Sequence, residues 1–222
     1  MSDDDDAPAL SADTLAILQE FYSENHGLTG PDRFTVGEVE EDWRMSQFWY
    51  SDETATRLAE ELTHTQTPPD LKAPRRSVAC VCAPSVYQKL KQGSVLGSDR
   101  VAAVVLEFDR RFAAYGTDFV FYDYNEPLAL DGAAARSFDV VLADPPYLSE
   151  ECLSKVSQTV KHLSKGKVLL CTGAVMEKLA GALLGVQVCG FLPQHNRNLS
   201  NDFRCFVNYP SRLLDAATPP RV

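Results

Sequence analysis

The chain has 222 residues, 45% of them hydrophobic and 23% charged, which is typical of a soluble globular protein and excludes a disordered or fibrous one. This length accommodates one α/β domain with an extension and little more. The formal net charge is −10, and no tract rich in Lys or Arg stands out. Because a protein that grips a phosphate backbone usually carries a basic surface, this balance argues against a nucleic-acid partner and for a basic one.

Membrane, export and metal-binding signals are missing from the sequence. No apolar run approaches the roughly 20 residues of a membrane helix, and the acidic start, MSDDDD, does not resemble a signal peptide. The six cysteines have neither the CxxC nor the Cys–His spacing of a metal site, and they are typical of free thiols in a reducing compartment. We therefore expect a cytoplasmic monomer without a metal and without membrane association.

Composition divides the chain into four parts. Residues 1–10 are acidic and are predicted to be a disordered tail, and residues 215–222 form a second tail. Residues 11–76 are predicted to form an N-terminal helical extension that ends in a Pro-containing linker, and residues 77–214 form the core. In the extension, one helix is expected from Ser11 and a second from Ser51 to about His64, where Ser51-Asp52-Glu53-Thr54 resembles a capping box.

Seven apolar, β-branched runs follow residue 76, and helical stretches separate most of them. They are Val78–Cys82, Val101–Phe108, Phe119–Tyr122, Phe138–Ala143, Lys167–Thr172, Val186–Leu192 and Phe203–Tyr209. Runs that are apolar on both faces predict a parallel sheet covered on both sides. Only a short loop joins the last two runs, and such a loop permits a hairpin but no parallel crossover. This pattern predicts an α/β, Rossmann-like class I methyltransferase fold: a seven-stranded, mostly parallel sheet whose last strand is antiparallel.

The most informative motif is Asp144-Pro145-Pro146-Tyr147, directly after the fourth predicted strand. Ligands of open α/β sheets bind at the carboxyl ends of the strands. The prolines fix the backbone, so that the Asp144 carboxylate and the Pro145 carbonyl can accept hydrogen bonds from an NH₂ group while the Tyr147 ring packs beside it. The alternative is a turn in which Asp144 only caps the next helix. Four such residues after a buried strand favour the functional interpretation.

These four residues resemble the [DNS]-PP-[YFW] motif of S-adenosyl-L-methionine-dependent enzymes that methylate adenine N6, glutamine amides or lysine. From about Phe21 to Tyr209 the chain is similar to the eukaryotic elongation factor 1-alpha lysine methyltransferase family, formerly described as N6-adenine-specific DNA methyltransferases. The segments that carry this resemblance are QFWYSDETA (47–55), CAPSVY (82–87), LEFDRRF (106–112), FYDYN (121–125), DPPYL (144–148) and NLSNDFRC (198–205). The resemblance implies that Asp144, Pro145, Pro146 and Tyr147 form the catalytic motif.

Residues that follow the first three predicted strands are candidates for binding the cofactor. Glu107 and Asp109 follow the second strand, where an acid accepts the ribose hydroxyls in dinucleotide folds, and similarity to methyltransferases with an E-x-D strand end favours Glu107. Asp123 would meet the adenine amino group, or else form a turn. The segment Ala83-Pro84-Ser85 replaces the usual Gly-x-Gly turn, and its small side chains still allow close approach of the cofactor.

The segment Gln47–Ala55 is predicted to complete the pocket. Its helix begins near Tyr50 and Ser51, and its first amides, with the Ser51 and Thr54 hydroxyls, would hold the methionine carboxylate. The aromatic residues before this helix would equally serve as a hydrophobic staple. The four histidines have no partner spacing and are interpreted as structural residues.

Charge separates a lysine substrate from an adenine substrate, which the motif alone does not. The net charge remains −6 when the four aspartates at positions 3–6 are set aside, whereas an adenine enzyme needs a surface that contacts phosphates. The resemblance implies a basic, transfer-RNA-binding elongation factor 1-alpha as partner, and an acidic enzyme complements it. We predict a protein-lysine N-methyltransferase. The alternatives are an N6-adenine nucleic-acid methyltransferase and a non-catalytic binding module, against which the joint presence of Asp144, Tyr147 and Glu107 argues.

Overall fold

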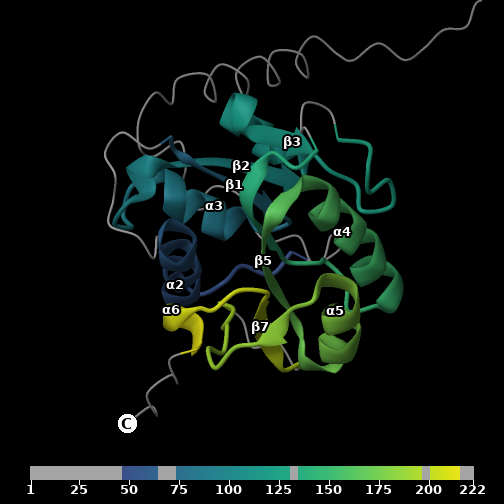
Figure 1. Cartoon of the computed structure of the whole chain (residues 1–222). Helices are drawn as coiled ribbons and strands as arrows, with labels where there is room; N and C mark the ends of the chain where they lie inside the picture. The colour runs from purple at the N-terminus through teal and green to yellow at the C-terminus, as the bar shows by residue number, and fades with distance from the viewer. Residues whose placement is uncertain (1–46, 65–73, 131–134, 197–200, 216–222) are drawn as a thin grey trace, which may run out of the picture. The chain divides into compact units, whose positions relative to one another are not determined.

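A computed structural model describes residues 47–64, 74–130, 135–196 and 201–215, which all belong to one compact unit (Figure 1). The predicted acidic tail, the helix expected from Ser11 and most of the predicted linker and second tail lie outside the described residues. Within the described ranges, no helix is both long and apolar enough to cross a membrane.

A seven-stranded sheet in the order β3-β2-β1-β4-β5-β7-β6 forms the centre of this unit. The strands are β1 (Arg76–Val81), β2 (Val101–Glu107), β3 (Phe119–Phe121), β4 (Phe138–Ala143), β5 (Ser164–Gly173), β6 (Gln187–Val188) and β7 (Phe203–Val207). The pairs β3–β2, β2–β1, β1–β4 and β4–β5 are parallel, whereas β7 is antiparallel to both β5 and β6. The predicted fold class and the antiparallel last strand are confirmed.

One strand is much shorter than the sequence predicts. The apolar run 186–192 yields only the two residues of β6, Gln187–Val188. Beyond Cys189, whose amide still bonds the Cys205 carbonyl, the chain leaves the sheet and the Phe191 amide donates to the Leu214 carbonyl at 2.8 Å. Cys189 and Phe191 are buried in the cluster that includes Leu214 of the C-terminal helix, whereas Leu192 is exposed, so the end of this run is not part of the sheet.

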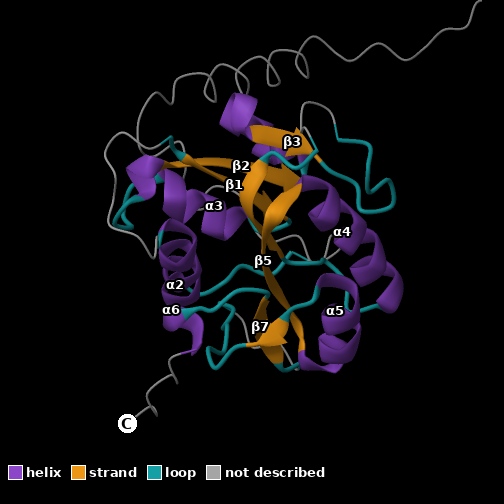
Figure 2. Cartoon of the chain, viewed as in Figure 1, coloured by secondary structure: helices purple, strands orange, loops and turns teal. Residues whose placement is uncertain are grey.

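Helices cover both faces of the sheet (Figure 2). They are α2 (Asp52–Thr63), α3 (Pro84–Lys91), α4 (Glu150–Leu163), α5 (Glu177–Leu184) and the short α6 (Arg212–Asp215). Buried residues of α2, α3 and α6 share one hydrophobic cluster, and those of α4 and α5 share the other. The cap predicted for α2 is confirmed, because the Ser51 hydroxyl accepts a hydrogen bond from the Thr54 amide.

The sheet contributes alternate residues of each strand to the two clusters. In β4, Val140 and Leu142 belong to the cluster of α2 and α3, whereas Val141 and Ala143 belong to the cluster of α4. Strand order reverses at β1, which lies between β2 and β4. The carboxyl ends of strands at such a switch point form the crevice in which ligands of α/β proteins bind.

Candidate active site

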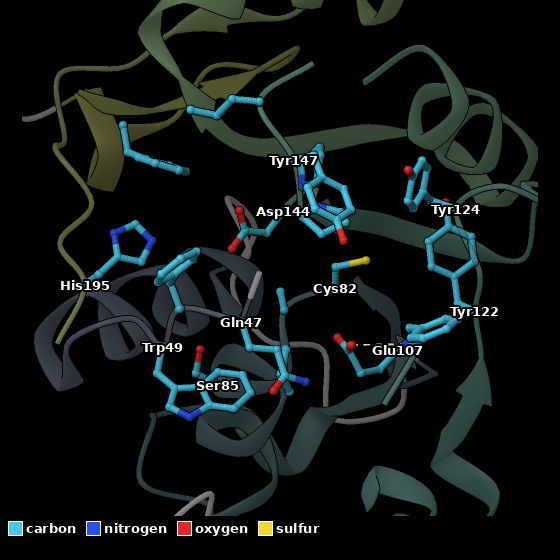
Figure 3. A pocket seen from close by; sticks show the side chains of 18 of the residues that line it. Gln47, Trp49, Cys82, Ser85, Glu107, Tyr122, Tyr124, Asp144, Tyr147 and His195 are labelled. Atoms are coloured by element: carbon cyan, nitrogen blue, oxygen red, sulfur yellow. Dashed lines mark hydrogen bonds between the residues drawn. The ribbon is translucent and has the colours of Figure 1, made fainter. Parts of the chain in front are cut away.

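A cavity of about 560 Å³ opens at this switch point (Figure 3). This volume falls in the range of sites that enclose a small molecule or a cofactor. The lining residues come from six parts of the chain that are distant in sequence. They are Gln47, Phe48 and Trp49; Cys82, Ala83, Pro84 and Ser85; Glu107 and Phe108; Tyr122, Asp123, Tyr124 and Asn125; Asp144, Pro145, Pro146, Tyr147 and Leu148; and, from the segment that includes β7, His195, Asn201 and Phe203.

The Asp-Pro-Pro-Tyr motif lies at the end of β4 and lines the cavity with all four residues. The Asp144 amide still donates to the Val81 carbonyl at 3.0 Å, so the strand-like backbone continues one residue beyond β4. The Tyr147 ring is 41% exposed and packs on the Tyr124 ring with centroids 5.6 Å apart. Asp144 does not cap α4, because the Ser149 hydroxyl accepts the hydrogen bond from the Cys152 amide. The alternative in which the motif is only a helix-capping turn is therefore removed.

Two acids, the buried Glu107 and the half-buried Asp144, give the cavity its electrostatic character. Burial raises the pKa of Asp144 to about 7, against the opposing effect of the Tyr50 hydroxyl. Burial also raises the pKa of Glu107 to about 7, although its Oε1 accepts hydrogen bonds from the Phe108 and Asp109 amides at 3.1 and 3.4 Å. No Lys or Arg from the described part of the chain lines the cavity. A cationic ligand would restore the ionised form of both carboxyl groups.

Glu107 and Asp109 have different surroundings. Glu107 lines the cavity, whereas Asp109 does not. Asp109 caps the 3₁₀ helix η5 (Arg110–Asp118) and accepts hydrogen bonds from the Arg111 amide at 2.9 Å and from Nε2 of Gln47 at 2.9 Å. Its ion pair with Arg111 at 2.7 Å contributes to a lowered pKa. Of the two acids, only Glu107 is placed to contact a ligand in the cavity.

The turn after β1 explains how this cavity forms without the usual glycines. Cys82 has a backbone φ of 55°, in the left-handed region that glycine normally occupies. Its side chain lines the cavity floor close to Glu107 and Asp144 (Figure 3). Ala83, Pro84 and Ser85 follow as the first turn of α3, and Ala83 provides no side-chain cap for it. Pro84 has no amide hydrogen, so Ser85, which lines the cavity, provides the first amide of α3 for a partner there.

Asp123 combines the two roles that its sequence suggests. It lines the cavity, and its Oδ1 accepts a 2.8 Å hydrogen bond from the Asn125 amide in a turn. The turn fixes the carboxylate at the end of β3, on the same side of the cavity as Glu107. Of the three acids predicted after β2 and β3 for the cofactor, Glu107 and Asp123 therefore line one cavity and Asp109 does not.

The positions of Tyr50 and Ser51 do not support their predicted contact with a cofactor. Neither residue lines the cavity. The Ser51 hydroxyl is engaged with the Thr54 amide and hydroxyl, at 3.2 and 3.1 Å, because it caps α2. The Tyr50 ring is buried and packs on His195 with centroids 4.8 Å apart. Both residues thus support the cavity wall from behind.

The sequence interpretation did not assign several lining residues to the site. His195 was interpreted as structural, but it lines the cavity and also packs edge-on against Phe203 with centroids 4.8 Å apart. The pairing that brings it there, between Tyr50 and His195, joins residues 145 positions apart and leaves no local pattern. Gln47 lies in the segment Gln47–Ala55 that the sequence predicts to complete the pocket, and it lines the cavity. Phe203 lies in a segment that resembles the methyltransferase family, and that resemblance is its signal in the sequence. Among the described residues, no group of three or more His, Cys, Asp or Glu side chains is arranged to hold a metal ion.

The fold is similar to that of a solved structure. The solved structure of a branched-chain polyamine synthase from Thermus thermophilus, in complex with N4-aminopropylspermidine and 5'-methylthioadenosine, is similar with a TM-score of 0.50 at 15% identity. The similarity covers 80% of this chain and 61% of that chain. At this identity it supports the fold alone.

Sequence comparisons identify the family. Residues 41–211 match the family model described as "Probable N6-adenine methyltransferase". The chain is 54% identical to a Mus musculus protein named EEF1A lysine methyltransferase 1, over 96% of this chain and 97% of that protein. It is 40% identical to a Caenorhabditis elegans protein-lysine N-methyltransferase, over 94% and 97% of the two chains. The chain therefore belongs to the EEF1A lysine methyltransferase 1 family.

Proposed function

We propose that this chain transfers a methyl group from S-adenosyl-L-methionine to the ε-amine of a lysine in eukaryotic elongation factor 1-alpha. The observation that carries the proposal is the convergence of the Asp144 carboxylate, the Pro145 backbone and the Tyr147 ring on one wall of the cavity. Relatives that are similar over nearly their whole length bear the names of lysine methyltransferases.

The cavity fits the cofactor by the chemistry of its walls. The carboxylate of Glu107 would accept the ribose hydroxyls, and Asp123 would accept the adenine amino group. The uncapped first turn of α3, at Ala83, Pro84 and Ser85, would meet the methionine part. When bound, the cofactor supplies a methyl group on a cationic sulfonium. The acids of the cavity complement that charge.

The motif residues orient the nucleophile. The Asp144 carboxylate and the Pro145 carbonyl would accept the two N–H bonds of a neutral lysine amine, which leaves the nitrogen lone pair directed at the methyl carbon. A lysine ammonium has a pKa of about 10.4 in water and must lose a proton first, which a water-shielded cavity favours. The Tyr147 ring, half-exposed at the rim, would lie along the aliphatic part of the lysine.

A basic protein substrate agrees with the charge of the chain better than a nucleic acid does. The net charge is −10, and no cation among the described residues lines the cavity to contact a phosphate. We further propose that the enzyme acts as a monomer, because one chain supplies every described wall of the cavity. We place it in the cytoplasm, where its six free cysteines remain reduced.

The proposal is tested by offering the purified enzyme and labelled S-adenosyl-L-methionine three acceptors in parallel: elongation factor 1-alpha, adenine-containing DNA and RNA. We expect label in the elongation factor only. Label in DNA or RNA without label in protein would replace the lysine assignment with the N6-adenine alternative. The absence of cofactor binding by calorimetry would indicate a non-catalytic binding module instead.

A further inference from the structure

The register of the sheet places three side chains in a row beside the cavity. β4 and β5 pair Ala143 with Leu170, so that Asp144 follows next to Cys171, and Cys171 pairs with Cys205 of β7. Leu142, Cys171 and Cys205 all belong to the hydrophobic cluster of α2 and α3. Because side chains alternate along a strand, Asp144 projects to this same face of the sheet.

Tyr50 covers this row from the segment before α2. Its side chain is 3% exposed and belongs to the same cluster as Cys171 and Cys205. Its hydroxyl is fully enclosed and makes no hydrogen bond of standard geometry with any described residue. The polar group that interacts with it is the carboxyl group of Asp144. Burial of a hydroxyl without a partner is unfavourable, so an enclosed hydroxyl that faces a carboxyl group indicates a donor and its acceptor.

Backbone hydrogen bonds and ring packing together fix the position of Tyr50. Tyr50 pairs with His195 in an antiparallel bridge, and the flanking Ser51 amide donates to the Gln194 carbonyl at 2.8 Å. On the other side, the Asn196 amide donates to the Trp49 carbonyl at 2.9 Å. The ring also packs on His195. These contacts hold the Tyr50 backbone and ring in place.

We propose that the buried hydroxyl of Tyr50 is the positioning group of Asp144: it donates to the carboxylate from behind the cavity wall and holds the carboxylate toward the substrate amine. The inference rests on the proposed role of Asp144 in orienting a lysine. Hydrogen bonds at catalytic sites are commonly long before the substrate binds and tighten in the complex. Tyr50 itself remains a neutral donor, because burial and the Asp144 charge raise its pKa well above the ordinary value.

Several ionisable groups lie near Asp144, Cys171 and Cys205. One of them raises the pKa of Asp144, and the Tyr50 hydroxyl opposes that effect. Burial raises the pKa of Asp144, and the charge of Glu107 at the end of β2 raises it further. Cys82 after β1 and the pair Cys171 and Cys205 lie close by. Burial raises the pKa of the Cys82 thiol, and contact with Cys171 together with burial raises the pKa of the Cys205 thiol. His195 completes the set across the cavity. Among these groups, the Tyr50 hydroxyl is the one that stabilises the ionised form of Asp144.

The test compares Tyr50→Phe with the wild-type enzyme by two measurements against pH. In protein labelled with ¹³C at the Asp carboxyl carbon, Asp144 is expected to titrate near 7, and Asp144→Asn identifies its signal. Loss of the Tyr50 hydroxyl should move this midpoint upward by about 1 pH unit. The rate of methyl transfer should fall by roughly tenfold below the wild-type midpoint and recover above the variant's midpoint.

The matched control is Tyr87→Phe. Tyr87 is fully buried in α3, bonds Asp118 at 3.0 Å and does not line the cavity. This variant should leave both the Asp144 midpoint and the pH profile unchanged. An unchanged midpoint in Tyr50→Phe, or a rate lowered by the same factor at every pH, would overturn the inference and leave Tyr50 a packing role.

Two further measurements test the inference if Tyr50→Phe does not fold or if the elongation factor is not a substrate. If Tyr50→Phe does not fold, the wild-type Tyr50 signal, labelled with ¹³C at the ring carbon that bears the hydroxyl, should titrate together with Asp144 and lose that response in Asp144→Asn. A Tyr50 signal that does not change as Asp144 titrates would refute the contact between the Tyr50 hydroxyl and the Asp144 carboxyl group. The carboxyl titration needs no substrate, so it still decides the role of Tyr50 if the elongation factor proves not to be methylated.

Discussion

Asp109 holds the side-chain amide of Gln47 through a 2.9 Å hydrogen bond and thereby ties the segment before α2 to the end of β2. Arg111 completes a triangle, because it pairs with Asp109 at 2.7 Å and donates to Oε1 of Gln47 at 3.3 Å. Gln47 lines the cavity, whereas Asp109 does not. Asp109 therefore acts on the cavity indirectly, through Gln47 and through Glu107, whose Oε1 accepts a hydrogen bond from the Asp109 amide at 3.4 Å.

Replacement of Asp109 by alanine should affect stability more than cofactor binding. The variant loses the cap of η5 and the contact with Gln47, so we expect the free energy of unfolding to fall by about 1–2 kcal/mol. Denaturant unfolding and calorimetric titration with S-adenosyl-L-methionine measure the two effects. A cofactor affinity that falls further in Asp109→Ala than in Glu107→Gln would contradict the assignment of the ribose to Glu107.

Glu107→Gln should weaken cofactor binding directly. A hydrogen bond to a charged group contributes about 1.5–3 kcal/mol, so the dissociation constant should rise by roughly 10- to 100-fold. Glu151→Gln, at an acid exposed in the first turn of α4 outside the cavity, provides the control and should leave the affinity unchanged. Equal affinities of Glu107→Gln and the wild-type enzyme would remove Glu107 from the cofactor site.

The raised pKa of Asp144 predicts how the stability of the cofactor-free protein depends on pH. An acid whose pKa is raised to about 7 by folding binds its proton more tightly in the folded state. It therefore contributes stability below its unfolded pKa of about 4 and loses that contribution as the pH rises to about 7. Asp144→Asn should remove a slope of up to about 1.4 kcal/mol per pH unit within this window. Denaturant unfolding at several pH values measures the slope, and identical slopes would contradict burial of an ionisable Asp144.

The left-handed backbone of Cys82 predicts an unusual order of stability between two variants. Cys82→Gly should be more stable than Cys82→Ala by about 1 kcal/mol, because a Cβ atom is unfavourable at a φ of 55°. Cys80, in the middle of β1, provides the matched control, and there the alanine variant should be the more stable one. Thermal unfolding of the four variants tests this, and the same order at both positions would refute strain at Cys82.

The strand pattern predicted most of this architecture because buried parallel strands leave continuous apolar runs, as at Phe138–Ala143. The pattern was wrong at β6, where Phe191 is buried against Leu214 of α6 and not in the sheet, and Leu192 is exposed. An apolar run is expected both in a buried strand and in a segment that packs against a helix, so burial alone does not distinguish these two environments. The same residue types therefore fit either outcome.

The candidate site was predictable where a residue follows a strand, and less so where distant segments meet. Glu107, Asp123 and Asp144 all follow strands and all line the cavity. His195 and Tyr50 depend on a pairing across the sequence, which no local spacing reveals. The left-handed backbone at Cys82 was not predictable for a different reason: a cysteine, unlike a glycine, does not indicate a positive φ.

The central claim is that Asp144 orients a lysine amine for methyl transfer. Mass spectrometry of purified elongation factor 1-alpha, after incubation with cofactor and either wild-type enzyme or Asp144→Ala, tests it most directly. We predict a methylated lysine with the wild-type enzyme and none with the variant, while the variant binds the cofactor within a few-fold of the wild-type affinity. Equal methylation by Asp144→Ala, or no methylation by the wild-type enzyme, would contradict the claim.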